Sequence, residues 1–189
     1  LITQVGAWIL EESVSQFRIW RRQVPDFAMS VNVSYIQLKE NALLEYLKMR
    51  QWDDLPAGQL VLELTESCWV PNLQFLNQEF EELRAMGYGI AIDDFGTEYA
   101  NLSLLSEVDF DILKLDKSMI DHITTNPKSR AVVETVSKVC HKLGICMVAE
   151  GIEEEDQFEI LRDFGVELIQ GYLFGKPVSI EEFEQRYMD

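Results

Sequence analysis

Short apolar runs alternate with amphipathic segments along almost the whole chain, and this alternation constrains the fold more than any other feature. The apolar runs have the length of buried β-strands, and hydrophobic residues recur at helical spacing in the segments between them. Strands that alternate with helices predict a parallel sheet covered by helices. One of the predicted helices spans Leu38 to Leu47. The predicted strands occupy residues 27–33, 60–66, 89–92, 112–116, 145–149 and 168–170.

Polar side chains stand at the carboxyl end of almost every predicted strand. An open doubly wound sheet gathers its ligand at one switch point, whereas a barrel uses residues from the ends of nearly all its strands. The distribution favours the barrel, although only about six of its eight strand–helix units can be counted. The predicted fold class is therefore α/β, an incomplete TIM-like (β/α) barrel. The strand-end residues are Asn32, Glu63, Asp93, Asp94, Lys114, Glu150 and Gln170.

The adjacent pair Asp93 and Asp94 is the strongest chemical signal in this set. Two ionised carboxylates side by side repel each other, so a site around them must supply cations or hold a proton. A pair of divalent metal ions would meet that need and would suit phosphate chemistry. A structural explanation is also open, in which the two aspartates close the strand and cap the segment that follows.

The remaining strand-end residues have structural alternatives of their own. Asn32 could cap a helix, Glu63 could form an ion pair, and Lys114 could neutralise a neighbouring carboxylate. Glu150 could belong to a turn, and Gln170 could satisfy a buried backbone group. Taken together, an amide, several carboxylates and one lysine around one rim describe a site for a hard metal ion with oxygen ligands.

The composition excludes several classes of partner. Asp and Glu number 33 against 16 Lys and Arg, which gives a formal net charge of −17. Such a chain lacks the basic face that non-specific binding to DNA, RNA or an anionic membrane requires. A phosphate ligand would need metal ions to invert the local potential. His122 and His141 fall on predicted helices outside the polar set, which disfavours zinc and a histidine base.

The cysteines and the apolar runs bear on the cellular location. Cys68, Cys140 and Cys146 are odd in number, lack metal-like spacing and fit a reducing cytoplasm as small core residues. No apolar run approaches the roughly 18 residues of a membrane span, and no signal peptide is visible. We therefore expect a cytoplasmic domain. Leu1 already stands in a helical pattern, so the chain is expected to belong to a longer protein, which could be membrane-anchored upstream.

Six motifs occur in one order along the chain: Asn32-Val33-Ser34, Glu63-Leu64-Thr65-Glu66, Asp93-Asp94-Phe95-Gly96-Thr97, Lys114-Leu115-Asp116, Ala149-Glu150-Gly151-Ile152-Glu153 and Gln170-Gly171-Tyr172-Leu173-Phe174. Together they resemble the EAL-domain family, the bacterial phosphodiesterases that cut cyclic di-GMP. The resemblance covers the whole chain. Six ordered motifs at compatible spacing are far more specific than any one of them.

The resemblance implies a modified TIM-like barrel with two Mg²⁺ or Mn²⁺ ions at its C-terminal rim. Asn32, Glu63 and Asp93 would be metal ligands, and Asp93 would bridge to the second ion, which Asp94 also holds. Glu150 would lie beside the attacking water as the general base and is counted among the metal ligands. The implied chemistry is in-line hydrolysis of one phosphodiester bond of cyclic di-GMP, which gives linear pGpG.

The resemblance also implies roles around this centre. Lys114 would hold the attacking water and offset charge in the transition state. Gln170 would be a catalytic group that contacts water or substrate. Gln170, Gly171 and Tyr172 would also bind the substrate. Glu153 would anchor the loop that follows the Asp-Asp pair.

The chain departs from the family pattern in two places. The Glu-Ala-Leu motif, whose glutamate is a further metal ligand, and a nearby phosphate-binding arginine do not occur. Residues 1–189 are therefore expected to be a single EAL-like domain without its N-terminal strands, and only weakly active alone. In the loop after Asp94, Glu98 and Ala100 stand where the family has glycine and serine. Glutamate resists the backbone angles that glycine permits.

Two functions follow from this pattern. One is metal-dependent hydrolysis of cyclic di-GMP in bacterial second-messenger signalling. The other is a catalytically inactive module that acts as a cyclic di-GMP receptor or a protein-interaction domain. The resemblance implies a homodimer through the loop after Asp94, and it allows an upstream sensor or GGDEF-type domain. A sugar or aldol enzyme on the same barrel would leave the carboxylates unexplained.

Overall fold

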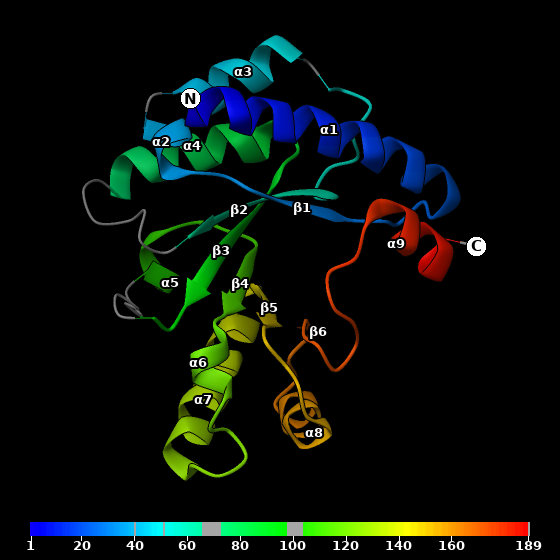
Figure 1. Cartoon of the computed structure of the whole chain (residues 1–189). Coiled ribbons are helices and arrows are strands. Elements are labelled where there is room, and N and C mark those ends of the chain that lie inside the picture. Colours follow the sequence, from blue (N-terminus) through cyan, green and yellow to red (C-terminus); the bar gives the residue numbers. More distant parts are fainter. Residues whose placement is uncertain (40, 51, 66–72, 98–103, 189) are drawn as a thin grey trace. The chain divides into compact units, whose positions relative to one another are not determined.

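The computed structural model describes residues 1–39, 41–50, 52–65, 73–97 and 104–188 (Figure 1). Predictions that concern Glu66, Cys68, Glu98 and Ala100 lie outside these residues. The chain divides into two compact units. The first comprises Leu1–Leu64, Gln78–Gly89 and Pro177–Asp189, and the second comprises Thr65–Asn77 and Ile90–Lys176.

The first unit packs helices around a parallel pair of strands. β1 (Met29–Asn32) pairs with β2 (Leu60–Thr65) in a register that sets Asn32 opposite Glu63. The long helix α1 buries Leu10, Val14 and Phe17 at the three- and four-residue spacing of an amphipathic helix. The helices that lie wholly or mainly in this unit are α1 (Ile2–Gln23), α2 (Tyr35–Lys39), α3 (Ala42–Arg50), α4 (Leu73–Ala85) and α9 (Ile180–Tyr187).

The single helix predicted over Leu38 to Leu47 is wrong, because two helices, α2 and α3, occupy this stretch. Asn41 stands directly before α3 with a φ of 53°, in the left-handed region. A left-handed residue cannot continue a right-handed helix, and asparagine adopts this conformation more readily than most side chains. The leucines nevertheless reach the core as predicted, since Leu38, Leu43 and Leu47 are at most 1% exposed.

The described residues of the second unit form four parallel strands, and neighbouring strands of the chain pair with each other. The carboxyl ends of these strands therefore meet at one edge. The pairs are β3 with β4, β4 with β5, and β5 with β6. The elements are β3 (Gly89–Phe95, whose first residue belongs to the first unit), α5 (Leu104–Glu107), β4 (Ile112–Leu115), α6 (Lys117–Ile120), α7 (Pro127–Leu143), β5 (Cys146–Ala149), α8 (Glu155–Asp163) and β6 (Leu168–Ile169).

The strand predictions are confirmed, because all six predicted runs contain a strand. The apolar residues of β3 and β4 explain why: Ile90, Ile92, Leu113 and Leu115 are completely buried, as strands covered on both faces require. Within these strands, Asp93 and Lys114 are polar side chains that are also buried. A charged group inside an apolar strand needs a partner, and these two provide partners for each other.

The histidines and cysteines follow the sequence predictions only in part. His141 lies exposed on α7, but His122 lies in the turn after α6, so its predicted helical position is wrong. The short α6 ends at Ile120, and the backbone N–H of its C-cap residue Asp121 donates to Lys117 O, so His122 lies beyond the helix. Cys140 is buried and Cys146 is half-buried, as small core residues can be. Within the described ranges, no helix is both long and apolar enough to cross a bilayer.

Candidate metal and catalytic site

Asp93 and Asp94 lie on an irregular part of β3. Ile92 pairs with Leu113 and Phe95 with Leu115, so β3 advances three residues while β4 advances two. Asp94 has a φ of 58° at this bulge. Neighbouring side chains of a regular strand point to opposite faces, whereas a bulge with a left-handed residue lets both point to one side. The bulge is therefore what allows two consecutive aspartates to serve one site.

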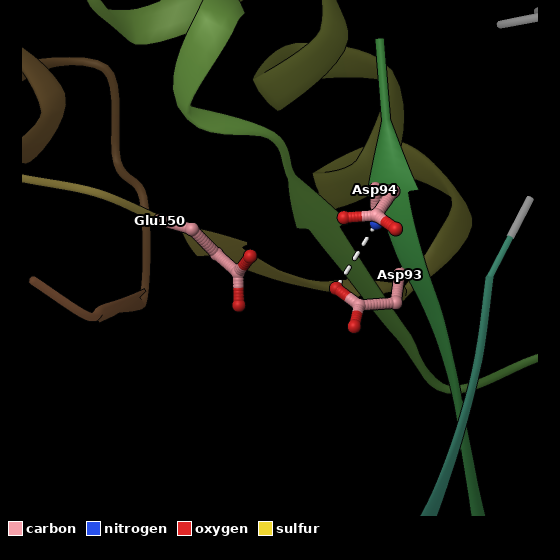
Figure 2. A group of neighbouring side chains, drawn as sticks. All are labelled: Asp93, Asp94 and Glu150. Carbon is pink, nitrogen blue, oxygen red and sulfur yellow. Dashed lines mark hydrogen bonds between the residues drawn. The ribbon is translucent and has the colours of Figure 1, made fainter. Parts of the chain in front are cut away.

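A third carboxylate reaches the same place from the end of β5. Glu150 directly follows β5, and one carboxylate oxygen from each of Asp93, Asp94 and Glu150 lies within 4.8 Å of the other two. In Figure 2, Glu150 points across toward the two aspartates of β3. The backbone N–H of Asp94 donates to Asp93 Oδ1 at 3.0 Å, which fixes the Asp93 carboxylate. The sequence prediction that these strand ends converge is confirmed for these three residues.

Lys114 supplies positive charge to this group. Its Nζ lies 3.0 Å from Asp93 Oδ1 and 2.7 Å from Glu150 Oε1, and only 6% of the residue is exposed. The register of β4 with β5 sets Leu115 opposite Ala149, which brings Lys114 and Glu150 to the same edge. One ammonium among three carboxylates leaves an excess of negative charge when all are ionised. A divalent cation held by oxygen ligands would offset that excess.

The electrostatics of Asp94 agree with an excess of negative charge. Burial raises the pKa of the Asp94 carboxyl above its ordinary value of 3.8. Repulsion from Asp93 and Asp116 raises the same pKa further, and attraction to Lys114 opposes these effects. The folded protein therefore binds the Asp94 proton more tightly than the unfolded chain does.

This shift leads to a prediction for Asp94→Asn in the metal-free protein. A raised carboxyl pKa gives a stabilising contribution that is complete below the unfolded pKa and is lost as the pH rises through the folded pKa. The charged Asp94 carboxylate thus destabilises the fold at neutral pH, and asparagine removes that charge while tolerating the left-handed backbone. We expect Asp94→Asn to raise the Tm at pH 7 by about 1–2 °C, a small shift because solvent screens a half-buried group.

Thermal unfolding followed by circular dichroism, with EDTA present, checks this expectation. At pH 3.5 the two proteins should unfold at nearly the same temperature, since the aspartate is then largely protonated in both states. A variant that unfolds at a lower temperature than the wild type at pH 7 would contradict the destabilisation assigned to burial and charge repulsion of the Asp94 carboxylate.

Gln170 lies at the neighbouring strand end. It follows β6 directly, and its backbone N–H donates at 2.8 Å to the carbonyl of Ala149, the residue that precedes Glu150. The Gln170 residue is exposed. Tyr172 is 57% exposed, and Lys176 Nζ lies 5.3 Å from the centre of its ring. This placement leaves both side chains accessible to a ligand, and their contact with substrate stays a prediction.

Gly171 has a packing role that the sequence did not reveal. A Cβ atom at this position would lie 2.1 Å from Ile152 O and 2.3 Å from Ile152 N, so no side chain fits. We expect Gly171→Ala to lower the free energy of unfolding by about 1–3 kcal/mol, the usual cost of overpacking a core. Urea unfolding measures the effect. Tyr172→Ala, which truncates the exposed neighbour, should change stability far less; equal effects would show that the close approach is easily relieved.

Glu153 is exposed, and its carboxylate accepts a hydrogen bond from Lys117 Nζ at 2.5 Å. Lys117 Nζ also lies 4.0 Å from Asp121 Oδ1. This ion pair was not predicted; Lys117 directly follows the Lys-Leu-Asp motif, but its partner is 36 residues away in the chain. The predicted role of Glu153 as an anchor of the loop after Asp94 stays a prediction, because residues 98–103 lie outside the described residues.

Asn32 and Glu63 belong to the first unit, where they form one pair at the ends of neighbouring strands. The register sets them opposite each other, and the Val33 N–H donates to Glu63 O at 2.8 Å. Glu63 is 9% exposed between two completely buried leucines, whereas Asn32 is exposed. An amide and a carboxylate thus share the carboxyl edge of this strand pair, as the sequence predicted. Their role as metal ligands stays a prediction.

Comparison with known proteins identifies the family. The family model of the EAL domain matches residues 1–177. The chain belongs to the EAL-domain family. The resemblance inferred from the six motifs is thereby confirmed, and the acidic cluster of the second unit together with Lys114 consists of residues from three of those motifs.

Relatives of this EAL domain include signalling proteins and solved enzyme structures. It is 35% identical to the signaling protein YkoW of Bacillus subtilis over 187 residues, which cover 98% of this chain and 23% of YkoW. The structure of the PaMucR phosphodiesterase in complex with c-di-GMP matches with a TM-score of 0.88 and 34% identity, over 97% of this chain and 75% of that one. BlrP1 of Klebsiella pneumoniae, in complex with manganese and cyclic di-GMP, matches with a TM-score of 0.74 and 30% identity, over 84% and 41% of the two chains.

These matches also establish the fold class. The chain forms an incomplete TIM-like barrel with six parallel strands, as predicted from the strand-end polar residues. The chain spans about a quarter of the length of the first curated relatives that it matches.

Proposed function

We propose that this EAL domain acts in a metal-dependent phosphodiesterase that hydrolyses cyclic di-GMP to linear pGpG in second-messenger signalling. The observation that carries the proposal is the meeting of Asp93, Asp94 and Glu150 around the buried Lys114. The similarity to PaMucR, a phosphodiesterase with c-di-GMP bound, supports the choice of substrate.

The donor set of this site fits a hard divalent cation. Its donors are carboxylate oxygens that lie within 4.8 Å of one another, and neither histidine nor cysteine belongs to the group. We propose Mg²⁺ or Mn²⁺, two ions in all, with Asp93, Asp94 and Glu150 as ligands and with Asn32 and Glu63 as further ligands from this chain. When bound, such ions polarise the scissile phosphate and make water more acidic. The presence of manganese with cyclic di-GMP in BlrP1 supports this assignment.

Glu150 and Lys114 are proposed to act on the attacking water and the phosphate. An ionised Glu150 accepts a proton from the water, and the 2.7 Å contact with Lys114 holds its carboxylate in place. The Lys114 ammonium also stabilises negative charge that develops on the phosphate oxygens. Lys114 is buried and Glu150 is half-buried at neighbouring strand ends, so both groups need little rearrangement during the reaction.

The residues after β6 are proposed to contact the dinucleotide. Gln170 would bind water or a polar group of the substrate, and the exposed Tyr172 ring offers an aromatic face. Gly171 keeps this segment close to Ile152, which places Gln170 and Tyr172 beside the segment that carries Glu150.

The proposed function is tested with the complete gene product that carries these 189 residues. Incubation with cyclic di-GMP and Mn²⁺ or Mg²⁺, followed by chromatography, should yield pGpG, and excess EDTA should abolish its formation. Binding of cyclic di-GMP without turnover would instead establish a receptor. If the protein neither binds nor hydrolyses cyclic di-GMP, that result would support a protein-interaction domain.

The oligomeric state, the upstream domains and the cellular location are proposals that rest on the family resemblance. A homodimer would form through the loop after Asp94, most of which lies outside the described residues. A sensor or GGDEF-type domain would precede this chain and control it, in a cytoplasmic setting. Light scattering of the complete gene product would test the dimer.

A further inference from the structure

The chain passes from β5 to α8 through residues 150–154, and Glu150 is the first residue of this segment. Ile152, two residues further on, is completely buried. Its N–H donates to Gln170 O at 3.2 Å, and its carbonyl accepts from the Leu173 N–H at 3.0 Å. The middle of the segment is thus fixed to the chain that follows β6.

Lys117 holds the segment from another side. Gly151 has a φ of 71°, and a Cβ atom there would lie 2.6 Å from both Cβ and Cγ of Lys117. The Lys117 ammonium reaches Glu153 at 2.5 Å. This ion pair is exposed and contributes little by itself, so the close packing of the Lys117 stem on Gly151 is the stronger restraint.

Gln157 fixes the far end of the segment. This side chain on α8 is 6% exposed, and its Oε1 accepts hydrogen bonds from the backbone N–H groups of Glu153 at 3.0 Å and Glu154 at 3.1 Å. The bond to Glu154, the N-cap residue, is the ordinary reciprocal bond of a capping box. The bond to Glu153 reaches one residue beyond the N-cap, into the segment that leads back to Glu150.

We propose that Gln157 is a positioning residue for Glu150, an inference that rests on the proposed function. Gln157 touches no reacting group. Gln157 holds the N–H groups of Glu153 and Glu154, and Gln170 and Leu173 hold the backbone of Ile152. Residues 150–154 are therefore fixed at both the middle and the far end. Glu150 therefore keeps its 2.7 Å contact with Lys114 and its place beside Asp93 and Asp94. Small displacements of a catalytic group produce large losses of rate.

Three variants of the complete gene product separate positioning from simple stabilisation. Gln157→Leu removes the acceptor oxygen, and Gln157→Glu keeps one. Asn126→Ala is a matched control, because Asn126 also accepts two backbone N–H bonds at a helix start, from Lys128 at 2.9 Å and Ser129 at 3.4 Å, on α7. Should Gln157→Leu not fold, Gln157→Met replaces it, since methionine keeps the volume and favours helix.

The first measurement is of kcat and KM for cyclic di-GMP with saturating Mn²⁺. We expect Gln157→Leu to lower kcat about tenfold with little change in KM, the size of effect seen when a supporting residue of a metal site is removed. Gln157→Glu should recover most of the lost rate. Asn126→Ala should lower the Tm comparably and leave kcat unchanged. A Gln157→Leu protein with lowered Tm and wild-type kcat would overturn the inference and leave only a helix cap.

The second measurement is of Mn²⁺ affinity and does not require turnover. Because Glu150 is in the proposed ligand set, Gln157→Leu should weaken Mn²⁺ binding about tenfold relative to the wild type and to Asn126→Ala. Unchanged affinity in a folded Gln157→Leu protein would overturn the inference. If the wild type binds Mn²⁺ but hydrolyses nothing, the proposed function fails, and weakened binding still supports the positioning role. A wild type that binds no Mn²⁺ overturns both.

Discussion

Glu150→Gln is expected to lower kcat for cyclic di-GMP hydrolysis by about a thousandfold while the protein stays folded, within the range for loss of a general base. Glutamine keeps the size of the side chain but cannot accept a proton from water at neutral pH. Its neutral oxygen can still accept a hydrogen bond from Lys114, which lies 2.7 Å from Glu150 Oε1. The measurement is the rate of pGpG formation at saturating cyclic di-GMP and Mn²⁺.

A charge control distinguishes this effect from a general change in surface potential. Glu159→Gln removes the same charge from an exposed position of α8 and should leave kcat within about twofold, because solvent screens exposed charges. Affinity for cyclic di-GMP in Glu150→Gln should fall much less than the rate does. If kcat of Glu150→Gln stays within tenfold of the wild type, another group accepts the proton, and the role given to Glu150 is wrong.

The strands and the convergence of Asp93, Lys114 and Glu150 were predictable from the sequence. The strands β2 to β5 are apolar runs that parallel packing buries on both faces, whereas β1 and β6 are partly exposed, and the apolar runs are visible without coordinates. Parallel neighbours place their carboxyl ends at the same edge, so polar residues at adjacent strand ends lie close to one another. The distances of 3.0 and 2.7 Å from Lys114 to its two carboxylates confirm that expectation.

The bulge in β3 could not be predicted from the same pattern. Simple alternation along a strand would send Asp93 and Asp94 to opposite faces. The register with β4 decides otherwise, through the extra residue between Ile92 and Phe95. The only local signal is that aspartate adopts the left-handed conformation more readily than most residues, as Asp94 does here. Register is a property of two strands, and one strand's sequence does not contain it.

The contacts that fix the segment after Glu150 could not be predicted from the sequence either. Gly171 lies against the backbone of Ile152, and Lys117 lies against Gly151. These pairs are distant in the chain, and neither has a periodic pattern that could reveal it. The family motifs point to Gly171 as a site residue, but the structure shows that a side chain at this position would clash with the backbone of Ile152. Gln157 lies outside all six motifs, so only its two hydrogen bonds identify it.

Lys114→Met is expected to lower the free energy of unfolding of the metal-free protein by about 3–5 kcal/mol, the usual result of removing one partner from a buried ion pair. The Lys114 side chain is 7% exposed, and those of Asp93 and Glu150 are 13% and 18% exposed. Methionine keeps most of the stem but leaves these carboxylates without the ammonium between them. Urea unfolding with EDTA measures the loss. Lys117→Met, which breaks an exposed pair with Glu153, should cost at most about 1 kcal/mol.

Manganese should reverse much of this loss, which makes the variant a test of the metal site. The ammonium and a divalent cation satisfy the same carboxylates, so removal of Lys114 leaves more negative charge for the ion to neutralise. A ligand that binds only the folded state stabilises it in proportion to the logarithm of its concentration over its Kd. Mn²⁺ should therefore raise the urea midpoint of Lys114→Met more than that of the wild type, although kcat stays low because the transition-state charge lacks its ammonium. An equal Mn²⁺ shift in both proteins would mean that the cation binds away from Asp93 and Glu150.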